Sequence, residues 1–154
     1  MKIRKRSSLV RFFAGEEHPV DASSPEFRFM KAVCDGDTKH VLSLFRDEKL
    51  FGKKKSAVDA PYGRFEGLSG IREFSQGFLA RFHAASAFMV PAVQTIANGR
   101  AVLEFEVNFE IDNELEQVPM ILVADLRTKQ ELDEVRIYCH HTYVPGLQAY
   151  RRPI

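Results

Sequence analysis

The sequence has little of what usually marks a metal, redox or nucleotide site. Its 154 residues include no tryptophan and only two cysteines, Cys34 and Cys139. Because no Cys-x-x-Cys pair or spaced Cys/His set accompanies them, the pattern argues against a structural zinc site and a disulfide framework. There is also no phosphate loop, dinucleotide fingerprint or His-Glu-x-x-His motif. We therefore expect reduced thiols in a cytoplasmic protein that uses no metal and no cofactor.

The sequence also lacks an excess of positive or negative charge, and it has no long apolar run. A net charge of +1 gives no overall field to attract nucleic acid or an anionic membrane, so neither is expected as a partner. No apolar run approaches the roughly 20 residues of a membrane helix. Arg11 interrupts the apolar segment 9–14, which argues against a signal peptide. We expect an irregular arm with a solvated basic start over residues 1–22, and one domain over residues 23–154.

The sequence does contain thirteen phenylalanines and one long alternating segment. Within residues 100–112, Leu103 and Phe105 share one parity, whereas Glu104 and Glu106 share the other. Period-two alternation of this length predicts a β-strand with one apolar face and one wet face. The apolar face needs a second layer, and most of the remaining chain can supply it.

The first half of the chain carries helical patterns. Ser23 followed by Glu26 is a capping-box pattern, and it predicts a helix that ends at Gly36. Asp37 is expected to cap a second, short helix.

Residues 57–66 contain Pro61 and Gly63 and predict a short strand running into a turn. Apolar residues at spacings of three and four then predict a third helix over residues 68–83. Gly77 weakens this helix and is expected to mark close packing.

From residue 87 onward the pattern changes to four strand-like runs. They cover residues 87–97, 100–112, 117–127 and 132–144. The Asn98-Gly99 dipeptide predicts a type I′ hairpin turn, and such short links predict an antiparallel meander. Helices first and strands later indicate an α+β fold, with three helices packed on the concave face of a curved antiparallel sheet.

Residues 117–127 are apolar on both parities, since Ile121 and Val123 alternate with Leu122 and Ala124. One face would meet the helices, and the other needs a further cover. One explanation is a homodimer in which a second copy packs against the convex sheet face. The alternative is that the arm over residues 1–22 folds back over the sheet.

Four segments carry a resemblance to a known family: Phe29–Asp37, Val41–Phe45, Asp59–Gly63 and Gly70–Phe74. Their order, with the helices and the meander around them, resembles the nuclear transport factor two-like superfamily, in its ketosteroid isomerase and polyketide-cyclase-like branch. The resemblance covers roughly residues 24–145. It implies a cone-shaped sheet wrapped around the helices, a pocket at the wide end, and usually a homodimer.

The resemblance also implies three polar catalytic positions, which this sequence does not keep. The general base directly before Pro-x-Gly falls on Ala60, and the nearest carboxylate is one place earlier, at Asp59. A one-residue shift turns a strand side chain to the other face unless a bulge intervenes. The tyrosine position falls on Phe29, and the protonated-acid position falls on Leu122. Since one oxyanion donor contributes about 2.7–4 kcal/mol, we expect no steroid isomerase activity.

Three other groups are candidates for proton transfer: Asp59, His141 and His83. Asp59 would be a buried carboxylate suited to proton abstraction; the alternative is an aspartate that bonds the turn backbone. His83 would lie at the pocket mouth; the alternative is a histidine at a helix C-terminus, favoured by the helix dipole. His141 shares a strand face with Ile137 and Cys139, so we expect it within roughly 10 Å of Asp59, around one ligand.

The predicted ligand-binding residues are mostly aromatic or apolar side chains of the helices, the turn and the inner strand face. They are Phe29, Val33, Tyr62, Phe74, Phe78, Phe105, Leu122, Ile137 and Cys139. Two functions follow. One is a cofactor-independent isomerase, cyclase or dehydratase that acts on a small hydrophobic or aromatic ring compound by proton transfer. The other is a non-catalytic dimeric module of the same fold that binds a ligand or a protein partner.

Overall fold

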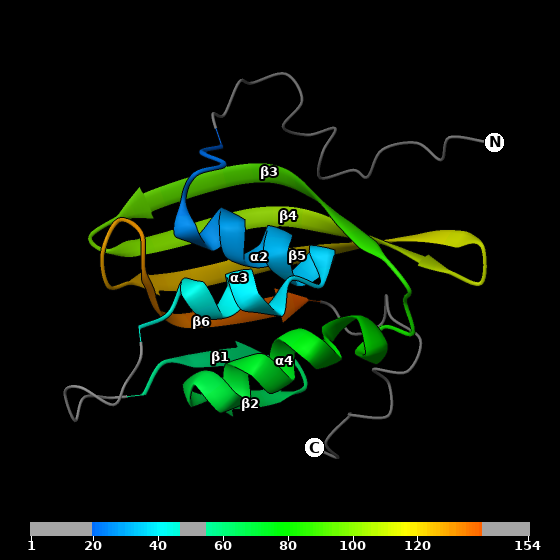
Figure 1. The fold of residues 1–154 in the computed structure, drawn as a ribbon. Coiled ribbons are helices and arrows are strands. Elements are labelled where there is room, and N and C mark those ends of the chain that lie inside the picture. Colours follow the sequence, from blue (N-terminus) through cyan, green and yellow to red (C-terminus); the bar gives the residue numbers. More distant parts are fainter. Residues whose placement is uncertain (1–19, 47–54, 140–154) are drawn as a thin grey trace, which may run out of the picture.

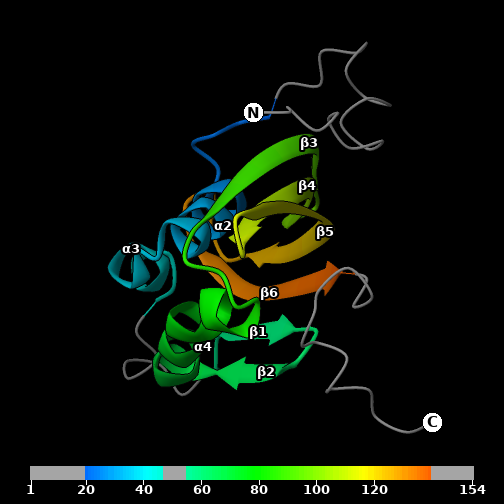
Figure 2. The same cartoon turned by 90° about the vertical axis from the view of Figure 1, so that its right-hand side faces the viewer.

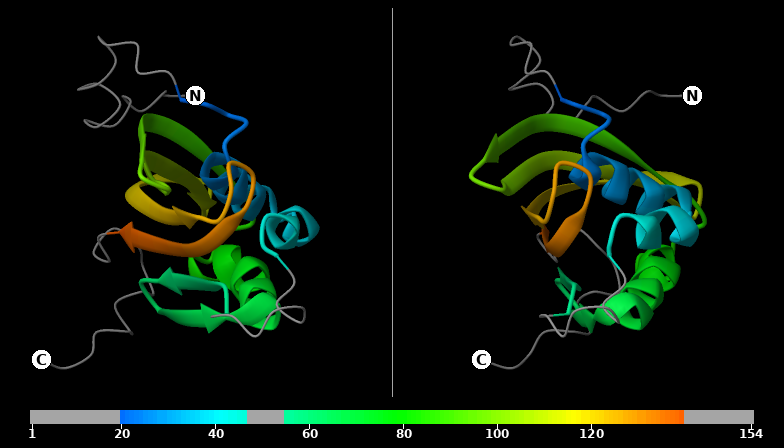
Figure 3. Two further views of the ribbon diagram at one scale, coloured as in Figure 1. Left: turned by 90° about the vertical axis from the view of Figure 1, so that its left-hand side faces the viewer. Right: turned by 60° about the vertical axis from the view of Figure 1, so that its left-hand side comes forward.

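The computed structural model describes residues 20–46 and 55–139. In these ranges, three helices lie on one face of a curved six-stranded sheet (Figure 1). Turned views show the same two layers, with the helices on the concave side and no described helix on the convex side (Figures 2 and 3). We call these two sides of the sheet the inner face and the outer face. The predicted α+β architecture is confirmed.

Helix α2 spans Pro25–Asp35 and ends at Gly36, whose φ of 70° is the left-handed conformation expected of a terminating glycine. The predicted capping box is wrong, because Ser24 is the N-cap and no side chain caps the helix. Instead, the Gln94 side-chain amide of the sheet donates hydrogen bonds to Ser24 and to the buried Glu26. The Glu26 carboxylate is therefore engaged by the sheet and not by the helix N-terminus.

The two other helices follow their sequence patterns closely. Helix α3 spans Thr38–Ser43, and Asp37 caps it by accepting a hydrogen bond from the His40 backbone at 3.0 Å. Helix α4 spans Gly67–Arg81 and buries the apolar stripe that predicted it. A Cβ added at Gly77 would have no atom within 4 Å, so the expected close packing at this glycine is wrong.

The segment over residues 57–66 forms more structure than the predicted strand and turn. Strand β1 spans Ala57–Ala60 and strand β2 spans Gly63–Glu66, and the two pair as a short antiparallel hairpin. β1 also pairs in parallel with β6, for example Val58 with Val135. Sequence periodicity is weak in strands this short, which is why β2 was not predicted.

The sheet has the strand order β2-β1-β6-β5-β4-β3, and its last four strands form the predicted antiparallel meander. They are β3 (Ala87–Ala97), β4 (Arg100–Ile111), β5 (Glu114–Leu126) and β6 (Leu132–Cys139). Asn98 and Gly99 have φ values of 52° and 73°, the positive values that a type I′ turn needs. The edge strand β3 contains a register shift between Pro91 and Val93.

The inner face of β4 confirms the alternation in the sequence, since Leu103 and Phe105 are fully buried. The outer parity is not uniformly wet, however, because Glu106 and Asn108 are each only 2% exposed. Gln117 of β5 donates to both of them, at 3.0 Å and 3.1 Å, and forms with them an outer polar cluster. Hydrogen bonds of this kind offset the cost of burying polar groups, although the second Glu106 carboxylate oxygen is buried and has no partner among the described residues.

Candidate ligand site

Three nearly parallel aromatic rings connect the helix layer to the β1–β2 turn. Phe29 of α2 stacks on Phe74 of α4 with ring centroids 6.1 Å apart and an interplanar angle of 8°. Phe74 stacks in turn on Tyr62 of the turn, at 6.3 Å and 17°. Phe65 of β2 packs an edge against Tyr62 at 5.9 Å and contacts Phe74 at 5.6 Å. We call Phe29, Phe74 and Tyr62 the ring stack.

A second run of rings leads from the ring stack to the sheet. Phe74 contacts Phe78, and Phe78 contacts Phe82, at centroid distances of 5.7 Å and 4.9 Å. Phe82 then stacks on Phe109 of β4 at 4.4 Å. Contacting rings therefore fill much of the space between α4 and the inner face, and they leave Tyr62 at the end of the series nearest the turn.

Tyr62 brings a polar group into this aromatic surrounding. Its hydroxyl oxygen is buried and has no hydrogen-bond partner among the described residues. The Arg81 guanidinium carbon lies 5.1 Å from the ring centroid, within the range of a cation–π contact. Burial raises the pKa of Tyr62, and the nearby Arg81 charge opposes that shift only in part. The phenol is therefore a neutral hydrogen-bond donor at physiological pH.

Cys139, at the end of β6, is the second polar group of this region. Burial raises the pKa of its thiol to about 11, so the sulfur is protonated at neutral pH. Cys139 lies close enough to Tyr62 for a thiolate to disfavour ionisation of the phenol. The region thus holds a hydroxyl and a thiol, both uncharged, beside a chain of phenylalanine rings.

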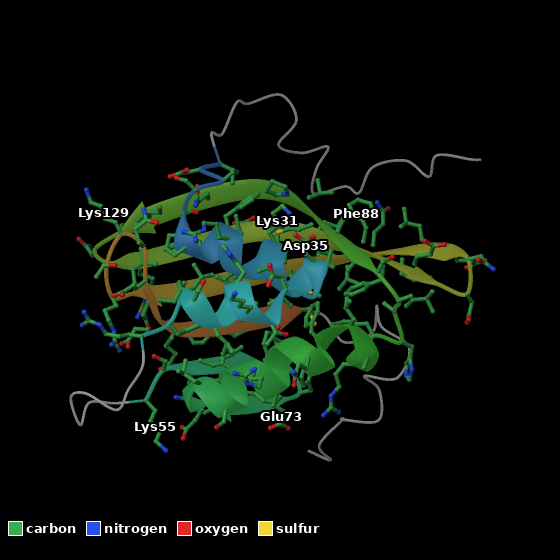
Figure 4. The ribbon with its side chains drawn as sticks, in the orientation of Figure 1. Lys31, Asp35, Lys55, Glu73, Phe88 and Lys129 are labelled. Carbon is green, nitrogen blue, oxygen red and sulfur yellow. The ribbon has the colours of Figure 1, made fainter. Side chains whose placement is uncertain are left out.

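A separate surface groove lies between α2 and α3. It has a volume of about 260 Å³ and is lined by Arg28, Lys31, Ala32, Asp35, Asp37 and His40. Lys31 and Asp35, labelled in Figure 4, form an ion pair of 2.6 Å. Since Asp37 accepts from the His40 backbone N–H and Arg28 donates to Gln130, each of these four charged side chains already has a hydrogen-bond partner.

In residues 20–46 and 55–139, no three or more His, Cys, Asp or Glu side chains gather in a way that would hold a metal ion. No helix in the same ranges is both long enough and apolar enough to cross a membrane.

Solved structures with the same architecture identify the fold. A protein of ketosteroid isomerase-like fold from Catenulispora acidiphila, solved in complex with trimethylamine, superposes with a TM-score of 0.64 over 79% of this chain and 89% of its own, at 13% identity. An NTF2-like protein from Anabaena variabilis has a TM-score of 0.61 over 91% of this chain and 96% of its own, at 14% identity. A third NTF2-like protein, from Cytophaga hutchinsonii, gives 0.55 over 82% and 96%, at 10% identity.

This chain has the NTF2-like fold. The resemblance drawn from the sequence is therefore confirmed at the level of the fold. No family model matches the sequence, and no curated protein matches it. The position of each predicted site residue is therefore taken from the structure of this chain.

The predicted ligand-binding residues divide into deep and rim positions. Phe29, Val33, Phe105 and Leu122 have no exposed surface, so they touch no void that would hold a water molecule. They support the site from within the core. Phe74, Phe78 and Ile137 are 1%, 2% and 4% exposed, whereas Tyr62 and Cys139 are half-buried near the turn.

Asp59 is not the buried carboxylate that we expected. Its cross-strand neighbours are Arg64 and Arg136, and β1 pairs with both β2 and β6 in register without a bulge. Asp59 therefore points to the outer face, where its carboxylate accepts a hydrogen bond from Arg64 at 3.1 Å and is 42% exposed. Ala60, at the position where the resemblance implies the base, takes the inner parity instead.

The two histidine candidates have different outcomes. His83 is exposed just beyond α4 with a φ of 52°, and its backbone N–H donates to Ala80 at 3.1 Å. This placement matches the alternative of a histidine at a helix C-terminus. His141 lies outside the described residues, and so does its expected distance from Asp59.

Two neighbours of Tyr62 were missing from the predicted site. Phe65 contacts both Tyr62 and Phe74, and Arg81 lies over the Tyr62 ring. Arg81 could have been found from the sequence, because it follows Phe74 and Phe78 at helical spacing. Phe65 could not, since the strand that carries it was predicted as a turn.

Proposed function

We propose that the protein binds a small apolar or aromatic ring compound on the inner face of the sheet, beneath the Pro61–Gly63 turn. The observation that carries this proposal is the exposure of the apolar residues. Ala60, Tyr62, Phe65 and Cys139 are half-buried residues of the turn region that pack against the buried core. Aromatic walls with a few polar groups are typical of small-molecule sites. The Catenulispora protein, of similar fold, was solved with a small organic amine, which supports this use of the fold.

We propose binding, rather than proton transfer, as the primary function. Asp59 lies in an ion pair on the outer face, so it supports neither an isomerase nor a dehydratase mechanism. An isomerase, cyclase or dehydratase activity would need a base beside the ring stack, where the polar groups described above are those of Tyr62, Arg81 and Cys139. Among the predicted catalytic residues, His141 would have to supply this base.

The binding proposal is tested by titrating ¹⁵N-labelled protein with indole, cyclohexanone and toluene at millimolar concentrations. Backbone amide shifts are expected to gather at Tyr62, Phe65 and Cys139. The variant Cys139→Leu adds volume at the inner rim and should reduce these shifts, whereas Thr95→Leu, on the outer face of β3, should leave them unchanged. Shifts confined to the outer face, or no shifts at all, would reject the proposal.

We also propose that a second copy of the chain covers the outer face. Phe88, Ile121 and Tyr138 come from three strands, point to this face, and are 54%, 43% and 54% exposed. Ile121 pairs directly with Tyr138, and Phe88 projects from β3 (Figure 4). Large apolar side chains gathered on one sheet face are characteristic of an interface, and two-fold dimers are the commonest assemblies.

Sedimentation equilibrium tests the dimer. Ile121→Asp should lower the association constant at least tenfold, because it places a charge in the centre of the contact. Ile96→Asp is the matched control, since Ile96 is 53% exposed but takes the inner parity at the end of β3. A monomeric wild type, or equal effects of both variants, would contradict a dimer through the outer face.

A further inference from the structure

We propose that the Tyr62 hydroxyl is the hydrogen-bond donor of the ligand site, and that the ligand is therefore a ring compound bearing an acceptor oxygen, such as an aryl ketone. This inference deepens the binding function proposed above and rests on it. It names the group that would orient the ligand and the chemical class that this group would select.

The first support is the unused bonding capacity of Tyr62. Its hydroxyl oxygen is buried and has no partner among the described residues, although it sits in a surrounding made mainly of rings. Leaving a buried donor without an acceptor is costly, and native structures rarely do so without a reason. A ligand oxygen that accepts from Tyr62 would remove that cost, which gives the site a preference for acceptors over plain hydrocarbons.

The second support is the way the Tyr62 ring is held. Phe74 stacks on one face at 6.3 Å, Phe65 packs an edge at 5.9 Å, and the Arg81 guanidinium lies over the ring at 5.1 Å. Phe74 is itself fixed by Phe29, which has no exposed surface. The stacking on Phe74 and Phe29 orients the Tyr62 ring, and with it the C–O bond, before any ligand arrives, which limits the conformational entropy lost by the donor.

The third support is the charge state and charge surroundings of the donor. Burial raises the pKa of Tyr62, so the hydroxyl keeps its proton throughout the physiological range. The positive charge of Arg81 lies near enough to act on the phenol, and it would also favour a ligand oxygen that carries partial negative charge. Cys139 adds a neutral thiol near Tyr62, which is a weak donor at most.

The burial of the hydroxyl also sets a condition on access. Its oxygen is covered in this structure, so a ligand reaches it only when a neighbouring side chain moves. Phe65, Arg81 and Cys139 are the half-buried neighbours, whereas Phe74 is held within the core. We expect access to occur on their side of the Tyr62 ring.

Two probes of nearly the same shape test the donor. Acetophenone carries a carbonyl acceptor, and α-methylstyrene replaces that oxygen with a methylene group. Wild-type protein should bind acetophenone more tightly than α-methylstyrene. Tyr62→Phe should weaken acetophenone binding about tenfold, as loss of a buried hydrogen bond does, and should change α-methylstyrene binding less than twofold. Tyr138→Phe, on the outer face, should change neither.

A spectroscopic signature separates a hydrogen bond from a packing effect. The carbonyl stretch of bound acetophenone should move to lower wavenumber in the wild type and return toward its apolar-solvent position in Tyr62→Phe. Equal binding of the two probes by wild type and variant would overturn the donor inference while leaving the binding function in place. No binding of either probe by the wild type would remove both.

The stability of the free protein provides an independent check. Because the hydroxyl bonds no described group, Tyr62→Phe should leave the melting temperature unchanged or raise it. A clear fall in melting temperature, with Tyr138→Phe unchanged, would show that the hydroxyl already has a structural partner and would overturn the inference.

Discussion

Two glycines of the same helix are expected to respond to alanine in opposite directions. Gly77 lies in the interior of α4, and a Cβ built there meets no atom within 4 Å. At Gly70, a Cβ would lie 2.9 Å from the Phe65 carbonyl carbon and 3.2 Å from its Cα. Both substitutions gain the same helix propensity, so the difference between them isolates the contact with β2.

The magnitudes decide the sign of each effect. Replacing glycine by alanine inside a helix gains about 0.5–1 kcal/mol, so Gly77→Ala should raise the melting temperature by roughly 1–4 °C. Overpacking against backbone costs typically about 1–3 kcal/mol. This cost exceeds the propensity gain at Gly70, and Gly70→Ala should be destabilised by up to about 2 kcal/mol.

The assay is thermal and chemical denaturation of wild type and both variants, followed by far-UV circular dichroism. Near-UV circular dichroism adds a second readout, because Phe65 contacts Tyr62 and Phe74, and displacing its backbone should disturb the aromatic signal. Gly77→Ala should leave that signal intact. A Gly70→Ala variant as stable as Gly77→Ala would refute the close approach of β2 to α4.

Two further predictions concern ionisable groups. Burial disfavours the Asp125 carboxylate, but hydrogen bonds from Arg100 at 2.7 Å and Arg136 at 2.9 Å outweigh it, so its pKa lies below the usual value. A carboxylate with a lowered pKa stabilises the folded state fully above about pH 4, and this stabilisation is lost as the pH falls further. Asp125→Asn should therefore be less stable than wild type at pH 7, and the difference in stability should shrink at pH 3. A difference that stays constant with pH would contradict this. Burial also raises the thiol pKa of Cys34 to about 12 and of Cys139 to about 11. At pH 8, native Cys139 should therefore react with iodoacetamide roughly a hundredfold, and native Cys34 roughly a thousandfold, more slowly than the same thiols in urea. Rapid labelling of native Cys139 would contradict its burial.

The sequence predicted those parts of the fold that depend on local periodicity and turn chemistry. The alternation in β4, the Asn98-Gly99 turn and the glycine that ends α2 all occur as expected. Parity also anticipated that Asp59, one place from the implied base position, would face away from the inner side without a bulge. Each of these features is decided by residues close together in the chain.

The remaining features depend on contacts between distant segments. Glu26 accepts a hydrogen bond from Gln94 of β3 instead of closing a capping box. The residues near Glu26 in the sequence do not indicate this partner. Glu106 was expected to be solvated, but Asn108 and Gln117 hold it in the outer polar cluster. At the site, Tyr62 was predicted but Phe65 was not, because a four-residue strand carries too little periodicity to recognise.

The register shift in β3 has a consequence for how the molecule behaves at high concentration. β3 is a long edge strand of the described sheet. The unpaired backbone groups of an edge strand can pair with a strand of another molecule, which leads to aggregation. Pro91 lacks a backbone N–H, and the ladder breaks between it and Val93. A strand from another molecule could not form a continuous row of backbone hydrogen bonds with β3. This edge therefore resists strand-by-strand aggregation, while the rest of β3 keeps its regular pairing with β4.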